Sequence, residues 1–323
     1  MRHRRTRRRL TTRISAVQQH AFLDECSPGS HDCAGAGGPL DSAEKGRITL
    51  LLDPEATMNL HQRNNVHIHG TQPITMVFAH GFGCDQNMWR LLAPAFAGRF
   101  RTVLFDHVGS GGSDLSAYDP AKYDSLHGYA HDLNELLDAC VPGKAIFVGH
   151  SVSAMIGVLA DLERPGRLLG HVMVGPSPCY LNDGDYVGGF DRADIDELLA
   201  TMGSNYLGWS SNMAPAIMGA PERPELAQEL TNSFCRTDPV IAEQFARVTF
   251  LSDHRADLAR LQTPSLILQC SDDIIAPLSV GEYMHRTMEK SMLRIIENVG
   301  HCPHLSAPSA SAAAMEEFLA GLI

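Results

Sequence analysis

The fold of this chain can be read from one stretch, Ile146-Phe147-Val148-Gly149-His150-Ser151-Val152-Ser153. The apolar residues 146–148 predict a buried strand, and Gly149 opens a sharp turn with Ser151 at its apex. The turn follows the pattern G-x-S-x-G except at its last position, where Ser153 replaces glycine. A serine on such a strained turn between strand and helix presents its hydroxyl group to a cleft. The pattern therefore predicts an acid and then a histidine farther along the chain.

The composition describes a globular protein with an acidic balance. The 323 residues carry a formal net charge of −11, and 44% of them are hydrophobic. This length suffices for one large α/β domain with an insertion or for two small domains. No apolar run reaches the roughly 18–20 residues that span a bilayer, and the negative charge argues against nucleic acid as a partner. Eight cysteines are scattered without a C-x-x-C pair, which favours a reducing, cytoplasmic setting.

The N-terminal region differs in kind from the rest. Seven arginines and no acidic residue lie in residues 2–13, and no apolar segment follows them, so this is not a secretory signal peptide. Two interpretations stay open for residues 1–57: a disordered extension, or a miscalled start codon with Met58 as the native first residue. A basic arm that binds nucleic acid or anionic membranes is a further interpretation, but a single short basic block more often belongs to a solvated tail. We expect residues 1–57 to lie outside the fold.

Strands and helices alternate from residue 64 onward. Short apolar runs predict buried strands at residues 74–79, 101–106, 146–150, 171–176, 266–270 and 293–296. Residues 66–69 resemble one arm of a hairpin. Apolar residues at helical spacing predict helices at residues 86–97, 125–140, 154–163 and 307–322. This alternation predicts an α/β fold with a mostly parallel central sheet flanked by helices.

Residues 181–258 interrupt the alternation. They contain no convincing strand. Helical patterns lie at residues 191–202, 206–218, 224–234 and 239–252. We expect an all-helical insertion between two sheet strands, above the carboxyl edge of the sheet where α/β active sites lie. The predicted core then comprises residues 58–180 and 259–323.

An acid and a histidine follow Ser151 in the order that the turn demands. The loop after residues 266–270 holds two aspartates, and Asp273 is favoured over Asp272 because it begins the D-x-x-x-P form usual for this loop. After the last predicted strand, His301 directly follows a glycine and is the candidate base. For His304, three residues farther along the chain, we expect a structural role. The three residues Ser151, Asp273 and His301 form the predicted catalytic set.

Two backbone amides are predicted to stabilise the oxyanion that attack by Ser151 would create. One belongs to Val152, the residue after the nucleophile. The other belongs to Phe82, in the loop after an early strand, where flanking glycines let the backbone approach a substrate closely.

The sequence gives little support for a metal site or a cofactor site. The crowded residues His301, Cys302 and His304 offer three ligand atoms, but no second Cys/His pair stands at zinc-finger spacing, so no metal is expected. The glycine-rich residues 109–113 match neither a phosphate loop nor the dinucleotide pattern G-x-G-x-x-G. We therefore expect no cofactor.

Longer motifs carry a resemblance to the α/β-hydrolase superfamily. Within it the chain resembles the group of the bacterial sigma-B stress-pathway hydrolase RsbQ and the plant strigolactone and karrikin receptors, from about residue 60 to 323. The segments that carry this resemblance are HGFGCDQ (80–86), GPSPCYLND (175–183), SDHR (252–255) and GHCPH (300–304).

The resemblance implies a Ser/Asp/His triad at Ser151, Asp273 and His301. It also implies that residues 181–258 form a four-helix lid over a small, mostly apolar pocket, lined by Phe82, Val152, Phe190, Trp209 and Met213.

The activity implied is hydrolysis of a small, mostly apolar ester or lactone. The bacterial relative further implies stress signalling as an activator of a PAS-domain phosphatase or other PAS-containing regulator. Two alternatives remain: a stand-alone carboxylesterase without a signalling partner, and a lyase or perhydrolase on the same fold.

Overall fold

The computed structural model describes residues 60–323. The predictions made for residues 1–57 and for a start at Met58 lie outside the described residues.

A seven-stranded sheet forms the centre, in the order β1-β3-β2-β4-β5-β6-β7. All neighbouring strands run parallel except β1, which pairs antiparallel with β3. The predicted mostly parallel sheet is confirmed, and its middle strands are almost wholly buried because helices cover both faces. The strands are β1 (His67–His69), β2 (Thr75–Ala79), β3 (Arg101–Phe105), β4 (Ala145–His150), β5 (Leu168–Val174), β6 (Ser265–Asp272) and β7 (Ser291–Val299).

Two sequence predictions are wrong in this half of the fold. Residues 66–69 do not form a hairpin with the next strand, because β1 pairs with β3 instead. Residues 86–97 do not form one helix but two short 3-10 turns, η1 (Gln86–Trp89) and η2 (Ala93–Ala95). Pro94 lies inside the second turn, and proline lacks the N–H that a continuous α-helix would need there.

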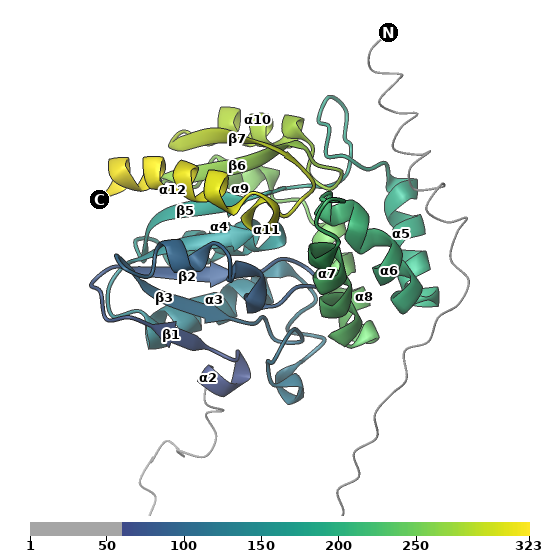
Figure 1. Cartoon of the computed structure of the whole chain (residues 1–323), viewed down its shortest axis with the longest axis horizontal. Helices are drawn as coiled ribbons and strands as arrows, with labels where there is room; N and C mark the ends of the chain where they lie inside the picture. The colour runs from purple at the N-terminus through teal and green to yellow at the C-terminus, as the bar shows by residue number, and fades with distance from the viewer. Residues whose placement is uncertain (1–59) are drawn as a thin grey trace, which may run out of the picture. The chain divides into compact units, whose positions relative to one another are not determined.

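Alternate residues along a strand pack into two separate hydrophobic cores, one on each face of the sheet. Ile146 and Val148 of β4 pack into one cluster, and Phe147 between them packs into the other. In Figure 1, α12 crosses in front of the sheet while α3 and α4 lie behind it. The first layer contains η1, η2, α11 (Pro303–Ser306) and α12 (Pro308–Leu322). The second layer contains α3 (Leu126–Cys140), α4 (Val152–Glu163), α9 (Arg255–Leu258) and α10 (Leu278–Thr287). Two short elements, α2 (Leu60–Arg63) and η3 (Leu115–Ala117), complete the described chain.

Between β5 and β6 the chain forms α5–α8, which gather beside one end of the sheet (Figure 1). Their bounds are α5 (Arg192–Ser204), α6 (Tyr206–Met218), α7 (Pro224–Arg236) and α8 (Pro239–Leu251). The end of α6 touches the loop after β7: the backbone N–H of His301 donates to the carbonyl of Ile217 at 2.7 Å. Gly219, with φ 65°, ends α6 there, where a Cβ would lie 2.6 Å from the Val299 carbonyl oxygen. This contact places α6 directly above the carboxyl edge of the sheet.

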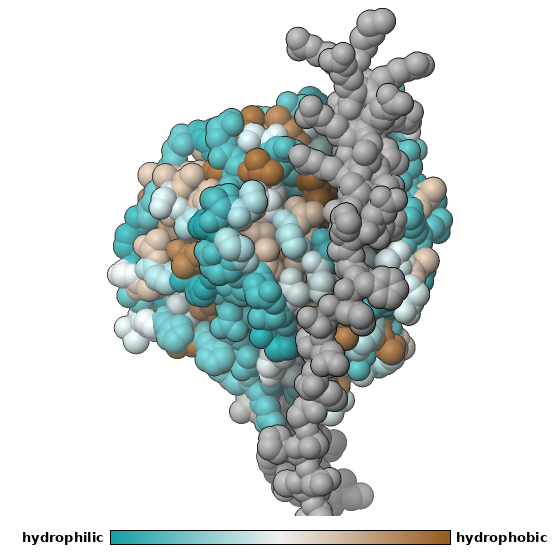
Figure 2. All heavy atoms as spheres, turned by 45° about the vertical axis from the view of Figure 1, so that its right-hand side comes forward, coloured by the Kyte–Doolittle hydropathy of each residue, from teal (hydrophilic) through white to brown (hydrophobic). Residues whose placement is uncertain are grey.

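Within residues 60–323, no helix is both long and apolar enough to cross a membrane. The face in Figure 2 is mostly hydrophilic, with apolar residues scattered among polar ones.

Candidate active site

Four loops meet at the carboxyl edge of the parallel strands. Ser151 follows β4, Asp273 follows β6, and His301 follows β7 after one glycine. The loop of residues 80–83 follows β2. Strands β2 and β6 lie on either side of the β4–β5 pair, so chain segments that are far apart in sequence converge on one place.

Ser151 occupies the strained conformation that its motif predicts. Its φ is 55°, a left-handed value uncommon for a residue with a Cβ, and its N–H donates to the Val174 carbonyl at 2.8 Å. Gly149 is needed because a Cβ there would lie 2.7 Å from the carbonyl of Ser153. The turn thus depends on close packing of β4 against α4, and it directs the hydroxyl group of Ser151 away from the backbone.

The three side chains predicted from the sequence lie in one hydrogen-bonded line. His301 Nδ1 donates to Asp273 Oδ2 at 2.7 Å, which leaves His301 Nε2 as the acceptor for the Ser151 hydroxyl at 2.8 Å. Asp273 is fixed in turn, since its Oδ1 accepts the N–H groups of Ile275 and Ala276 at 2.8 and 3.1 Å. All three side chains are buried, so the attraction between imidazolium and carboxylate would be little screened by water.

Asp272 is separated from this line. It is exposed, and only its backbone carbonyl takes part in the fold near the site, accepting the Gly300 N–H at 2.8 Å. The geometry therefore brings Asp273 and not Asp272 to His301.

The predicted oxyanion amides belong to two chain segments that meet at Ser151. Neither the Phe82 nor the Val152 N–H donates to another backbone carbonyl in the described part of the chain. The loop of Phe82 lies close to the nucleophile turn: a Cβ on Gly81 would be 2.5 Å from His150 Nδ1 and 3.2 Å from Ser151 Cβ. Only a residue without a side chain permits that approach.

Ser153, where the motif has glycine, ties the two halves of the site together. Its hydroxyl donates to the His80 carbonyl, so it accepts from His107 Nε2 at 2.8 Å. The His107 backbone N–H donates to His80 Nε2 at 3.1 Å. All three residues are buried. This closed network holds the loop that carries Phe82 against the helix that carries Val152.

We predict that Ser153→Ala lowers the free energy of unfolding by about 1–3 kcal/mol, because a buried donor on His107 and a buried acceptor on His80 lose their partner. Urea denaturation measures this. Ser211, an exposed serine on α6, provides the matched control: Ser211→Ala should change the free energy by less than about 0.5 kcal/mol. Equal stability of the two variants would contradict the network's role.

A small cavity with a volume of about 30 Å³ opens over Ser151. This is far below the roughly 300–1,000 Å³ typical of ligand pockets, so the space over Ser151 is narrow in this structure. Its wall is mostly apolar and aromatic, with Ser151 and His301 at the base. The lining residues are Phe82, Cys84, His150, Ser151, Tyr180, Ile217, Leu230, Phe234, Thr249, Phe250, Ile275, His301 and Cys302.

Of the predicted pocket residues, Phe82 lines this cavity, but Val152, Phe190, Trp209 and Met213 do not. Phe190 packs edge-on against Phe250, which itself lines the cavity. Trp209 stacks on Tyr206 with ring centroids 6.1 Å apart, and Met213 is half-buried against the same core. These side chains support the wall from behind.

Two polar cavity residues were not found by sequence reasoning. The Tyr180 hydroxyl lies 3.3 Å from Ser151 Oγ, and burial raises the pKa of that phenol, so it stays protonated. The Thr249 hydroxyl is buried and has no hydrogen-bond partner among residues 60–323. Tyr180 stands six residues after the end of β5, close to the carboxyl edge, which is the one signal that could have identified it.

Three buried histidines around the site are held neutral. Burial lowers the pKa of His107 and His150 well below its usual value and lowers that of His304 to about 3. Each histidine must therefore take up a proton when the chain unfolds at a pH below about 6.5.

We predict that stability is constant above pH about 6.5 and falls as the pH is lowered from there toward about 3, the pKa of His304. Each neutral histidine contributes a slope of at most about 1.4 kcal/mol per pH unit. The midpoint of urea denaturation, measured at pH 7.5, 6 and 5, tests this. These pH values lie above the range in which ordinary carboxylates titrate. A midpoint that stays level from pH 7.5 to 5 would contradict the prediction.

Comparisons with known proteins place this site in a family. The model of the alpha/beta hydrolase family matches residues 76–314. The chain is 38% identical over 250 residues to karrikin insensitive 2 receptor CA of Petunia hybrida, covering 77% of this chain and 93% of the receptor. It is 40% identical over 234 residues to a probable esterase of Oryza sativa subsp. japonica, covering 72% of this chain and 86% of the esterase.

Among solved structures, a hydrolase from Oleispira antarctica matches with a TM-score of 0.79 and 42% identity, over 81% of this chain and 96% of that one. These matches support a hydrolytic enzyme. This chain belongs to the α/β-hydrolase family, close to its strigolactone and karrikin receptor members.

Proposed function

We propose that this protein hydrolyses small, mostly apolar esters or lactones, with Ser151 as nucleophile, His301 as general base and Asp273 as the orienting acid. The observation that carries the proposal is the continuous line from Ser151 through His301 to Asp273, with contacts of 2.8 and 2.7 Å, at the base of a mostly apolar cavity. A nucleophile, a base and an orienting group within hydrogen-bond reach are the requirements of acyl transfer.

In this reaction Ser151 Oγ bonds to the substrate carbonyl carbon as its proton passes to His301 Nε2. The carbonyl oxygen becomes an oxyanion between the amides of Phe82 and Val152, each donor of this kind being worth about 2.7–4 kcal/mol in the transition state. His301 then returns the proton to the leaving alcohol. Water, deprotonated by the same imidazole, attacks the acyl group and releases the acid and free Ser151.

The size and the lining of the cavity point to the substrate class. A narrow cavity of about 30 Å³, walled by residues such as Phe82, Phe234 and Phe250, favours small acyl groups over long chains. The unpartnered Thr249 hydroxyl gains a hydrogen bond if the substrate presents a polar atom to it, as a lactone does. We propose that residues 181–258, which contain α5–α8, act as the lid that keeps water from the reacting groups.

The experiment compares p-nitrophenyl acetate with p-nitrophenyl octanoate and with small lactones, in water labelled with oxygen-18. We expect kcat/KM to be higher for the acetate than for the octanoate. We also expect one labelled oxygen in each acid product, because water cleaves the acyl-enzyme. Turnover without uptake of labelled oxygen, or only in the presence of peroxide, would instead indicate a lyase or a perhydrolase.

A receptor role is the second candidate, and the names of the relatives favour it. A protein 38% identical to this chain is a karrikin insensitive 2 receptor. We propose that ligand hydrolysis here serves stress signalling in the cytoplasm through a PAS-domain phosphatase or another PAS-containing regulator. Ligand-dependent co-purification of such a regulator would support this role. Turnover of about 10 per second or more without any partner would favour a stand-alone carboxylesterase.

A further inference from the structure

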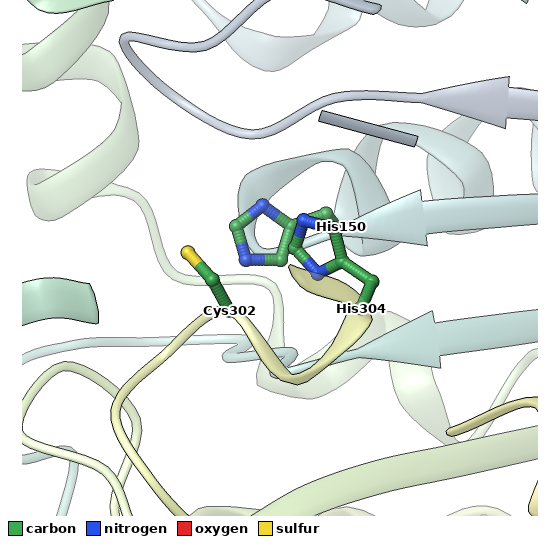
Figure 3. A group of neighbouring side chains, drawn as sticks. All are labelled: His150, Cys302 and His304. Carbon is green, nitrogen blue, oxygen red and sulfur yellow. The ribbon is translucent and has the colours of Figure 1, made fainter. Parts of the chain in front are cut away.

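Three buried side chains gather directly behind the catalytic line: His150, Cys302 and His304. Each offers one ligand atom, and these atoms all lie within 4.8 Å of one another. Figure 3 shows the two imidazole rings beside each other, with the thiol of Cys302 next to them. The ring centroids are 4.5 Å apart, and the three residues are at most 2% exposed.

The nitrogens of this group lack partners. His150 Nδ1 and both ring nitrogens of His304 have no hydrogen bond within the described residues. A buried polar atom without a partner typically costs about 1–3 kcal/mol, so three such atoms in one place call for an explanation. His150 Nε2 donates to the His301 carbonyl at 3.0 Å, and His150 Nδ1 therefore carries a free lone pair.

That hydrogen bond is of the kind that orients a metal-binding histidine. Histidines that bind metals usually donate their other N–H to a carbonyl or a carboxylate, which fixes the ring and its tautomer. Neither ring nitrogen of His304 has a hydrogen-bond partner within residues 60–323, so a lone pair on this ring is also available to an ion. His301 cannot join the group, because both of its ring nitrogens are engaged by Ser151 and Asp273.

We propose that His150, Cys302 and His304 form a binding site for Zn²⁺ or a chemically similar divalent transition-metal ion. Two imidazole nitrogens and one thiolate are ligands that Zn²⁺ favours. Tetrahedral geometry with bonds of roughly 2.0–2.3 Å places such atoms about 3.3–3.6 Å apart, so the group must close by about 1 Å. As the metal–sulfur bond forms, the thiol proton leaves to solvent.

The cavity supplies the route to this site. His150 and Cys302 both line the space above Ser151, so an ion can enter where the substrate enters. An ion bound there would displace His150, which donates to the His301 carbonyl, and Cys302, which follows His301 in the chain. The site therefore acts as an inhibitory site: Zn²⁺ lowers hydrolytic activity, and a chelator restores it.

The competing explanation is packing alone. The His304 ring packs at a tilt against Trp89, with centroids 4.8 Å apart, and against His150, and a neutral core histidine would also do so. The test must therefore detect the ion itself. Co²⁺ is a suitable probe, since a bound thiolate gives a charge-transfer band and a tetrahedral site gives strong visible absorption.

The full chain is freed of metal with a chelator and titrated with Co²⁺, and each variant's activity is compared with and without Zn²⁺. We expect one Co²⁺ per chain with a thiolate band, and reversible inhibition by Zn²⁺. Cys302→Ala should lose the band and weaken Zn²⁺ inhibition by about 10–100-fold or more. Cys140 is buried on α3, outside both the group and the cavity lining, so Cys140→Ser should keep both responses.

His304→Asn provides a second variant, accepted only if its circular dichroism and thermal unfolding match a folded protein, and should behave like Cys302→Ala. Absence of a thiolate band in the wild-type protein would overturn the proposal. Undiminished inhibition of Cys302→Ala would also overturn it, because the ion would then bind elsewhere. Since the Co²⁺ titration needs no substrate, its outcome is independent of the proposed esterase activity.

Discussion

Replacement of Ser151 by alanine is expected to lower kcat for p-nitrophenyl acetate by about 10⁴-fold or more. The change removes the only oxygen that accepts the acyl group and donates to His301 Nε2. The residual rate then comes from the oxyanion amides and from substrate binding. Steady-state kinetics on the purified full chain measures the loss.

Ser311 supplies the matched control for this experiment. It is a fully buried serine on α12, outside the cavity lining, and its hydroxyl has no hydrogen-bond partner in the part of the chain that the structure describes. Ser311→Ala should keep the wild-type rate. If Ser151→Ala kept more than a tenth of the activity, another residue would be the nucleophile.

The adjacent aspartates Asp272 and Asp273 provide the second large effect. Asp273→Asn should lower kcat by about 10⁴-fold, because the amide no longer selects the His301 tautomer that presents a free Nε2 to Ser151. Asp272→Asn should change kcat by only a few fold, since its side chain is exposed and does not contact His301. Parallel kinetics and circular dichroism of the two variants separate catalysis from folding. Equal losses in both variants would contradict the assignment of roles.

Much of the fold follows from patterns that are local in the chain. The buried strand before Ser151, the strained turn and the alternation with helices each depend on neighbouring residues, and the mostly parallel sheet is confirmed. The pairing of β1 with β3 is set by contacts across more than 30 residues, which no local pattern encodes. Residues 86–97 have helical spacing, but Pro94 interrupts the hydrogen bonds that a helix needs.

The site shows the same division. The acid, the histidine and the oxyanion loop are tied to strand ends, so their order and spacing predicted which residues would meet. The cavity wall could not be predicted, because the aromatic residues of α5–α8 are buried whether they face the cavity or a neighbouring helix. Trp209 faces Tyr206 and Phe234, whereas Phe250 faces the cavity.

Ser153 and His150 illustrate what a motif alone leaves out. The motif describes Ser153 as a small residue, but in the fold its hydroxyl joins His80 to His107. His150 fills a variable position of the motif, yet it holds the His301 carbonyl across 151 residues of sequence. Both roles need partners from other strand ends, and these are known only once the chain has folded.

The central claim is that Ser151 is an activated nucleophile, and covalent labelling tests it most directly. The full chain is treated with diisopropyl fluorophosphate and the modified residue is located by peptide mass spectrometry. We predict one adduct per chain, on Ser151, that is absent in Ser151→Ala and lost in His301→Ala. No adduct at all, or an adduct on a different residue, would contradict the account.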